Sequence, residues 1–229
     1  MNCFRQTIFM KLRIYILLFI AAICFVVAYT SISDKHSKKQ SLPIINPIDV
    51  TNELVDSTIQ RKGYGHKIQS FEFLNQYGNK ISDKDLANSV YVVEYFFTTC
   101  STICPKMNTQ MKVLQKKFKG VENFKILSFT VQPEIDSVPI LKKYAEEYGA
   151  ENGQWHFLTG DKKEIYTLAR KSFFLLKPVE AQNLGDASSD FIHTNNFVLI
   201  DKNKRIRGYY DGTSAKEVEK LARDIQKLL

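Results

Sequence analysis

The hydrophobic pattern divides this 229-residue chain into an apolar N-terminal run, a polar stretch and a long region of alternating elements. Residues 14–33 carry no formal charge, and residues 14–28 are almost wholly apolar. Residues 34–63 combine scattered charges and prolines with no sustained apolar period, which is typical of an extended linker. We therefore expect an N-terminal membrane anchor or signal segment over 1–33, a linker over 34–63, and a folded domain over 64–229.

The domain pattern alternates between strand and helix signals. Strands are expected at 71–73, 80–82, 90–97, 124–131, 155–158, 197–200 and 205–210. Helices are expected at 105–119, 138–148, 162–172 and 214–229, with Asp161 capping the third and Ser214 with Glu217 capping the last. Strand-helix-strand crossovers produce parallel pairs, whereas hairpins add antiparallel ones. This order predicts an α/β fold with a mixed sheet flanked by helices on both faces.

The charge balance excludes one class of partner. The 32 Lys and Arg residues exceed the 24 Asp and Glu residues, which gives a net charge of +8. No cluster of basic residues is interleaved with exposed aromatic residues, so we expect no nucleic-acid partner. The charge fits membrane-flanking residues and a solvated surface.

The apolar run is a marginal membrane span. It reaches the ~20 residues that a spanning helix needs only if Thr30, Ser31 and Ser33 are included. A cleaved signal peptide stays open as an alternative, and Cys24 invites a lipoprotein interpretation that the bulky Ile23 disfavours. We expect a single-pass protein of the bacterial inner membrane with its soluble domain on the periplasmic side.

Cys100 and Cys104 carry the candidate chemistry. They form a Cys-x-x-x-Cys motif between the strand at 90–97 and the helix that follows, while Cys3 and Cys24 are expected to be apolar filler in the N-terminal segment. The positive end of a helix favours the thiolate, which is the form that attacks disulfides or binds metal. A structural disulfide is the alternative, but a bridge that closes so small a ring would contribute only about 2 kcal/mol. We therefore favour a functional pair.

His193 is the candidate third ligand. Three residues between the cysteines make a larger loop than that of a Cys-x-x-Cys redox motif, so both sulfurs can converge on one ion. In α/β proteins, bound molecules and ions usually lie beyond the carboxyl ends of the parallel strands, and Cys100 is expected at such a position. Two thiolates and one imidazole suit copper, whereas zinc normally takes a fourth ligand.

The other soft side chains have simpler interpretations. His156 is expected to be a core or edge residue of its strand, and His66 and His36 to be solvated loop residues. Met107 and Met111 follow a helical spacing, which favours core packing over metal ligation.

Four motifs resemble the SCO (SenC) family, and the resemblance covers the chain from about His66 to the C-terminus. They are FFTTCSTICPKM at 96–107, SFTVQPEID at 128–136, WHFLTG at 155–160 and DFIH at 190–193. The resemblance implies a membrane-tethered protein of thioredoxin-like fold that binds copper through Cys100, Cys104 and His193. It also implies a role in cytochrome c oxidase assembly, either delivering copper to the binuclear site or reducing the cysteines of that site.

Three positions depart from the family pattern. Ser101 stands where the family usually has proline, and Gln132 where an acidic residue is common, which leaves Asp136 as the matching carboxylate. Ile192 replaces a frequent acidic neighbour of the histidine, and Asp190 is the nearest alternative partner. None of these departures affects the three ligands.

The leading hypothesis is a non-enzymatic copper metallochaperone whose partner is the copper-site subunit of cytochrome c oxidase or another envelope copper protein. The alternative is an envelope thiol-disulfide oxidoreductase in which Cys100 attacks a substrate disulfide and Cys104 resolves the mixed disulfide. A peroxidase of the peroxiredoxin type and a non-catalytic interaction domain are two further possibilities that the sequence leaves open.

Overall fold

The structure, a computed structural model, describes residues 16, 18–30, 42–51, 54–55, 59, 63–175 and 194–229. The chain divides into two compact units, Met1–Ser41 and Leu42–Leu229. In the first unit, residues 16 and 18–30 are helical and their side chains are exposed. Among the residues that the structure describes, none of the helices combines the length and the hydropathy that a bilayer span requires. The N-terminal anchor stays a prediction.

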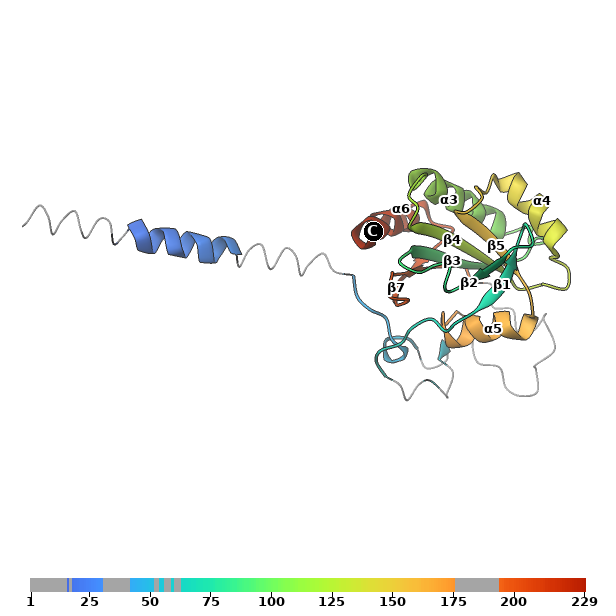
Figure 1. Cartoon of the computed structure of the whole chain (residues 1–229), viewed down its shortest axis with the longest axis horizontal. Coiled ribbons are helices and arrows are strands. Elements are labelled where there is room, and N and C mark those ends of the chain that lie inside the picture. The colour runs from blue at the N-terminus through green and yellow to red at the C-terminus, as the bar shows by residue number, and fades with distance from the viewer. Residues whose placement is uncertain are drawn as a thin grey trace, which may run out of the picture. The chain divides into compact units, whose positions relative to one another are not determined.

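The second unit is built on a seven-stranded mixed sheet with the strand order β2-β1-β5-β4-β3-β6-β7 (Figure 1). The strands are β1 (Glu72–Asn75), β2 (Lys80–Ser82), β3 (Val90–Phe96), β4 (Phe124–Thr130), β5 (Trp155–Thr159), β6 (Asn196–Ile200) and β7 (Ile206–Asp211). β3, β4 and β5 are parallel, whereas β1, β2, β6 and β7 join the sheet antiparallel. The expected mixed α/β architecture is confirmed.

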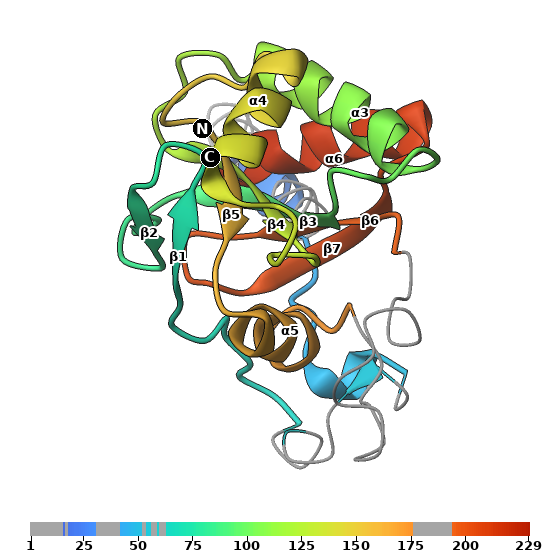
Figure 2. The same ribbon diagram turned by 90° about the vertical axis from the view of Figure 1, so that its right-hand side faces the viewer.

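Helices cover both faces of this sheet (Figure 2). They are α3 (Cys104–Lys117), α4 (Val138–Tyr148) and α6 (Ala215–Leu228) on one face, and α5 (Lys162–Lys171) on the other. Successive residues of β3 alternate between two buried clusters: Val92 packs with the three-helix face, and Tyr91 and Val93 pack with the α5 face. A strand covered on both sides needs apolar residues at nearly every position, which explains the continuous apolar run.

Local signals fix the helix ends. The Asp161 carboxylate accepts a hydrogen bond from the Glu164 N–H at 2.9 Å, and the Ser214 hydroxyl accepts one from the Glu217 N–H at 3.4 Å. α4 ends before Gly149, whose φ of +68° is the left-handed conformation that glycine adopts at helix ends. The bounds of α4 agree with the sequence prediction, and the other helices agree to within three residues at each end.

Part of the expected linker belongs to the compact unit that begins at Leu42. The Ile45 N–H donates to the Ile206 carbonyl at 2.9 Å, and the Arg207 guanidinium donates to the carbonyls of Leu42 and Pro43, the latter at 2.8 Å. Pro47–Asp49 form a short 3₁₀ helix, labelled η1. These contacts join residues distant in the chain, so the local pattern of 34–63 gave no sign of them.

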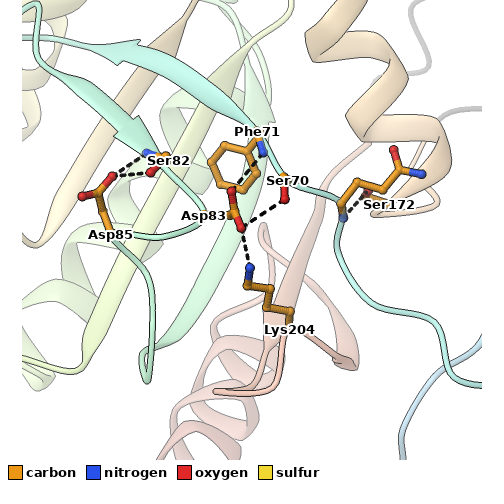
Figure 3. Close-up of polar contacts among 8 residues, drawn as sticks. Ser70, Phe71, Ser82, Asp83, Asp85, Ser172 and Lys204 are labelled. Atoms are coloured by element: carbon orange, nitrogen blue, oxygen red, sulfur yellow. Dashed lines mark hydrogen bonds and ion pairs between the residues drawn. The ribbon is translucent and has the colours of Figure 1, made fainter.

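Figure 3 shows the buried carboxylate of Asp83, which joins the segment just before β1 to the turn between β6 and β7. Asp83 accepts hydrogen bonds from the Phe71 N–H at 3.3 Å and the Ser70 hydroxyl at 3.4 Å, and it pairs with Lys204 in the turn between β6 and β7. This cluster lies at the opposite end of β3 from Cys100.

The other end of the sheet brings two distant parts of the chain together. β6 runs antiparallel to β3, with Tyr91 opposite Ile200 and Val93 opposite Val198. Asn196, the first residue of β6, therefore lies at the end of the sheet where β3 finishes and the Cys100 loop begins.

Candidate functional site

The two cysteines lie where β3 passes into α3. The Cys100 N–H donates to the Phe97 carbonyl at 3.2 Å, which closes a tight turn directly after the strand. Cys104 is the first residue of α3, and Pro105 occupies the first helical turn, where its missing N–H costs no hydrogen bond. The sequence prediction of a strand-to-helix junction is confirmed.

Both sulfurs are present as free thiols and are largely enclosed. Cys100 is 7% exposed and Cys104 is 2% exposed. The Cys104 thiol hydrogen-bonds to the Cys100 sulfur, and the Cys100 Sγ lies 3.7 Å from the Thr102 Oγ1. Because the two sulfurs are this close, both can bind one soft ion or join as a disulfide.

Cys100 is the more acidic thiol. Burial raises the pKa of Cys100, but hydrogen bonds from the backbone N–H and thiol of Cys104 and from the backbone N–H and hydroxyl of Thr102 outweigh it and lower the pKa to about 7. A large part of the Cys100 population is therefore thiolate at neutral pH, as the nucleophilic and metal-binding roles both require.

Cys104 has the opposite character. Burial raises the pKa of Cys104 well above its ordinary value, and a hydrogen bond from the Phe97 backbone offsets only part of this rise. The neighbouring Cys100 sulfur and the Glu94 carboxylate raise the pKa further. At neutral pH the reduced pair therefore combines a Cys100 that is partly thiolate with a Cys104 that stays protonated.

Asp136 fastens the loop that leads to Cys100. This carboxylate is fully buried and accepts hydrogen bonds from the Thr98 N–H at 3.2 Å, the Thr98 hydroxyl and the Thr130 hydroxyl. A further bond joins the Thr99 hydroxyl to the Gln132 side-chain oxygen at 3.3 Å. The loop after β3 is thus tied to the loop after β4, and the departure of Gln132 from the family pattern leaves this tie in place.

A second buried acid, Glu94, lies in β3, the strand that leads to the thiols. Glu94 is fully buried in β3, where it accepts a hydrogen bond from the Ser128 hydroxyl at 2.6 Å, and that hydroxyl accepts from the Trp155 indole N–H at 2.9 Å. Burial raises the pKa of Glu94 to about 8, although the Ser128 hydrogen bond acts in the opposite direction. Its second oxygen has no hydrogen-bond partner among the described residues.

Sequence reasoning missed this acid as a functional neighbour. Its only signal was one carboxylate within an otherwise apolar, β-branched and aromatic strand, where an ionised group would be costly. The contact between Asp136 and Thr98 was also invisible, because it joins positions 38 residues apart.

The structure tests three of the simpler interpretations. Met107 and Met111 are 1% and 0% exposed and pack in the core, as predicted. His156 is a buried residue of β5 whose Nδ1 lies 3.5 Å from the Asn75 amide nitrogen, and burial lowers its pKa to about 4. The prediction of a solvated His66 is wrong, because its half-buried ring bonds the Ser172 carbonyl at 2.8 Å and lies against Phe174.

The third predicted ligand, His193, lies outside the described residues, as do Asp190, Ile192 and His36. Within the described part of the chain, no group of three or more His, Cys, Asp or Glu side chains has a metal-binding arrangement. The structure therefore brings together Cys100 and Cys104 and leaves the place of His193 as a prediction.

A mixed α/β domain with two adjacent thiols just beyond the carboxyl end of β3, an interior strand of the sheet, defines a class of dithiol proteins of redox or metal-binding type. The sequence profile of the SCO1/SenC family matches residues 60–229. This chain belongs to that family.

Relatives of known structure agree with this assignment. The SCO1 protein homolog of Bacillus subtilis is 34% identical over 165 residues, covering 70% of this chain and 82% of that protein. A SCO1/SenC family lipoprotein from Bacillus anthracis is 31% identical with a TM-score of 0.61, covering 71% of this chain and 95% of its own. The structure of BsSco, a member of the Sco family of cytochrome c oxidase assembly proteins in which a disulfide switch was identified, is 32% identical with a TM-score of 0.60 and covers 71% and 93%.

Proposed function

We propose that this protein is a copper chaperone for the assembly of a copper site of cytochrome c oxidase, with Cys100, Cys104 and His193 as the ligands of its copper cargo. The observation that carries the proposal is the pair of reduced, contacting sulfurs at the end of β3 in a chain of the SCO1/SenC family. Thiolate sulfur is a soft ligand that selects Cu(I), and the lowered pKa of Cys100 makes one thiolate available at neutral pH.

The course of the chain supports His193 as the third ligand. His193 precedes Asn196 by three positions, and Asn196 lies at the end of the sheet where the Cys100 loop begins. Three residues of extended chain span about 10 Å. We propose that the segment before Asn196 carries the imidazole to the two sulfurs.

Loading and delivery follow from ligand chemistry. Both thiols must lose their protons and His193 must be neutral to hold the ion, so binding releases protons and weakens in acid. Delivery then proceeds by ligand exchange, in which the sulfurs of a partner replace Cys100 and Cys104 one at a time. The partner that we propose is the copper-site subunit of cytochrome c oxidase or another envelope copper protein.

A Cu(I) titration tests this proposal. The full-length reduced protein would be titrated in competition with a Cu(I) chelator and compared with His193→Ala, Cys100→Ser and, as a matched control, His36→Ala. We expect a stoichiometry of one in the wild type, loss of binding for Cys100→Ser and weaker binding for His193→Ala, with the control unchanged. Equal affinity in all four proteins would exclude the proposed ligand set.

The asymmetry of the two thiols favours one alternative function, reduction of a disulfide in a copper-site partner. The Cys100 thiolate would attack one sulfur of the partner disulfide, breaking its S–S bond and forming a mixed disulfide. Cys104, once deprotonated, would then attack the Cys100 sulfur and release the second partner thiol. The partner gains two electrons and this protein ends as the Cys100–Cys104 disulfide. Unlike copper delivery, this reaction tolerates His193→Ala.

We further propose that residues 1–33 tether the domain to the bacterial inner membrane, with the domain on the periplasmic side. The uncharged run of residues 14–33 supports this, and the Bacillus anthracis relative is itself a lipoprotein. Extraction of membranes at alkaline pH separates the possibilities: the full chain is expected in the membrane pellet, and a chain lacking residues 1–33 in the supernatant. Recovery of both in the supernatant would contradict the tether.

A further inference from the structure

The helix that begins at the dithiol carries an unusual charge pattern. α3 contains Lys106, Lys112, Lys116 and Lys117 and no acidic residue. The neighbouring helices of the same face balance their charges, since α4 has two Lys and two Glu and α6 has four basic and three acidic residues. Only α3 on this face is basic throughout.

The lysines of α3 also have no anionic partners within the described part of the chain. On the neighbouring helix α6, by contrast, Lys220 pairs with Glu217, Arg223 with Glu219 and Lys227 with Asp224. On the opposite face, Lys162 of α5 pairs with Glu134 at 2.9 Å. No such ion pair involves Lys106, Lys112, Lys116 or Lys117. Their charge is therefore directed to solvent.

Three of these lysines lie on the exposed side of the helix whose first residue is Cys104. Lys106, Lys116 and Lys117 are exposed, as is Val113, which is 51% exposed between them. Positions 106, 113 and 117 project from the same side of a helix, because a residue turns about 100° and rises about 1.5 Å. This basic stripe extends about 16 Å from Lys106 to Lys117.

The carboxylates beside the Cys100 loop do not neutralise this stripe. Glu134 pairs with Lys162, and Asp136 is fully buried under hydrogen bonds from Thr98 and Thr130. The N-terminal end of α3 adds a partial positive charge at the same place. A partner that approaches Cys100 thus meets positive potential along the helix.

We propose that the basic stripe, formed by Lys106, Val113, Lys116 and Lys117, is a docking surface for an acidic protein segment whose own sulfurs react with Cys100. Charge complementarity over a stripe that begins two residues after Cys104 would orient the partner and raise the rate of productive encounter. This inference rests on the proposed function in one respect only, namely that partners exchange with Cys100.

Two charged probe peptides test the docking surface. Each would carry one cysteine as a mixed disulfide with thionitrobenzoate, and the two would differ only in having four Glu or four Lys beside it. The Cys100 thiolate attacks the probe disulfide and releases thionitrobenzoate, which is coloured, and Cys104 then releases the peptide thiol. The probe disulfide is reduced to two thiols while Cys100 and Cys104 become a disulfide.

The comparison uses two triple variants of the full chain, both in a background with Cys3 and Cys24 changed to Ser. One is Lys106→Gln, Lys116→Gln, Lys117→Gln. The control, Lys67→Gln, Lys84→Gln, Lys163→Gln, removes the same charge from three exposed positions outside α3. At about 20 mM salt we expect parent and control to react about tenfold faster with the acidic probe. The stripe variant should lose most of that preference, and about 500 mM salt should abolish it in all proteins.

A second readout separates failure of docking from failure of the thiol chemistry. Fluorescence anisotropy would follow a labelled, cysteine-free Glu-rich peptide binding to the Cys100→Ser form of each protein. If neither probe reacts but the stripe variant binds this peptide at least fivefold more weakly than the control, docking stands and the exchange chemistry fails. If stripe and control variants behave alike in both readouts, the docking surface is refuted.

Vesicles containing about 30% phosphatidylglycerol distinguish a membrane from a protein partner. Under the proposal, the stripe and control variants of the 1–33 deletion sediment equally with these vesicles. If the stripe variant alone loses vesicle binding while its peptide preference is unchanged, the stripe is a lipid-binding surface and the proposal is overturned.

Discussion

At the scale of single residues, the site contains two hydrogen-bonded thiols that differ in acidity and in exposure. Hydrogen bonds from Thr102 and Cys104 converge on Cys100, whereas Cys104 is held away from solvent in the core. The difference in pKa between the two thiols therefore arises from their hydrogen-bond donors and their burial. An incoming reagent or partner therefore meets Cys100 first.

Replacing Thr102 with Val should raise the pKa of Cys100 above 7, because it removes the hydroxyl donor to the sulfur. We expect the rate of iodoacetamide alkylation at pH 7 to fall about fivefold and its pH midpoint to rise. The measurement uses the background with Cys3 and Cys24 changed to Ser. Thr109→Val, whose hydroxyl bonds the Pro105 carbonyl instead, is the matched control, and an equal effect there would contradict the assignment.

Glu94 should make the free energy of unfolding fall as pH rises. Its pKa is raised from 4.5 to about 8 in the folded protein, so between these values the native state keeps a proton that the unfolded state has released. Stability is therefore fully present below pH 4.5 and declines, by up to about 1.4 kcal/mol per pH unit, until pH passes the folded pKa.

Denaturant titrations of the reduced protein across this window would check the effect. Glu94→Gln keeps the shape and a hydrogen-bond acceptor but cannot ionise, so its stability should lack that decline. The exposed Glu146→Gln is the control and should keep it. A wild type and a Glu94→Gln variant with parallel pH profiles would show that Glu94 does not titrate as the geometry indicates.

At the scale of elements, one carboxylate joins the loops that follow two adjacent parallel strands. Asp136 fastens Thr98 after β3 to Thr130 at the end of β4. Asp161 is also a structural carboxylate, but it caps α5 on the other face of the sheet. The two residues offer a matched comparison between a carboxylate at the site and one remote from it.

Asp136→Asn should destabilise the protein by about 2 kcal/mol, because an amide nitrogen cannot accept the threonine hydroxyl bonds. The substitution should also loosen the Cys100 loop. The rate of amide hydrogen exchange at Thr98 should then increase, and the rate of Cys100 alkylation should differ from that of the wild type. Asp161→Ala should cost about 1 kcal/mol through loss of the cap and leave the thiol reactivity unaltered. Equal thiol reactivity in both variants would remove Asp136 from the positioning of Cys100.

At the scale of the whole molecule, residues 42–51 are part of the packed domain. Arg207 holds them through the carbonyls of Leu42 and Pro43 and also pairs with Asp201 at 2.8 Å. Both side chains of that pair are largely buried, at 13% and 7% exposure. Removing one partner of such a pair costs more than breaking an exposed one.

Arg207→Ala should therefore lower the free energy of unfolding by about 3 kcal/mol. Arg207→Lys should give an intermediate loss, since an ammonium keeps the charge near Asp201 but lacks the planar fork that reaches the carbonyls. Chemical denaturation of the two variants beside the exposed Arg223→Ala measures the difference. A loss of less than 1 kcal/mol for Arg207→Ala would show that this anchor is dispensable.

The elements of this fold could be predicted wherever the signal was local. The bounds of α4, the buried β3 and the cap at Asp161 follow from apolar period, strand composition and a side chain three residues from its partner. The dithiol could also be located, because both cysteines lie within one five-residue segment, where the strand pattern ends and the helical pattern begins.

What could not be predicted depends on contacts between distant positions. The backbone hydrogen bond between Ile45 and Ile206, the ring contact of His66 with Phe174 and the hydrogen bond from Thr98 to Asp136 each join separate segments. Such contacts are decided by tertiary packing and leave no periodic trace in the sequence. His193 was a candidate from its residue type alone, and the resemblance to a family then implied its role as the third ligand.

The hydrogen bonds of Asp136 connect a solvent-exposed position to the loop that carries Cys100. Ile135, the residue immediately before Asp136, projects 48% of its side chain into solvent on the same loop. A molecule that binds at Ile135 would therefore contact the residue next to the carboxylate that anchors Thr98, two positions from Cys100. The residue that faces solvent and the residue that fixes the Cys100 loop are thus consecutive in the chain.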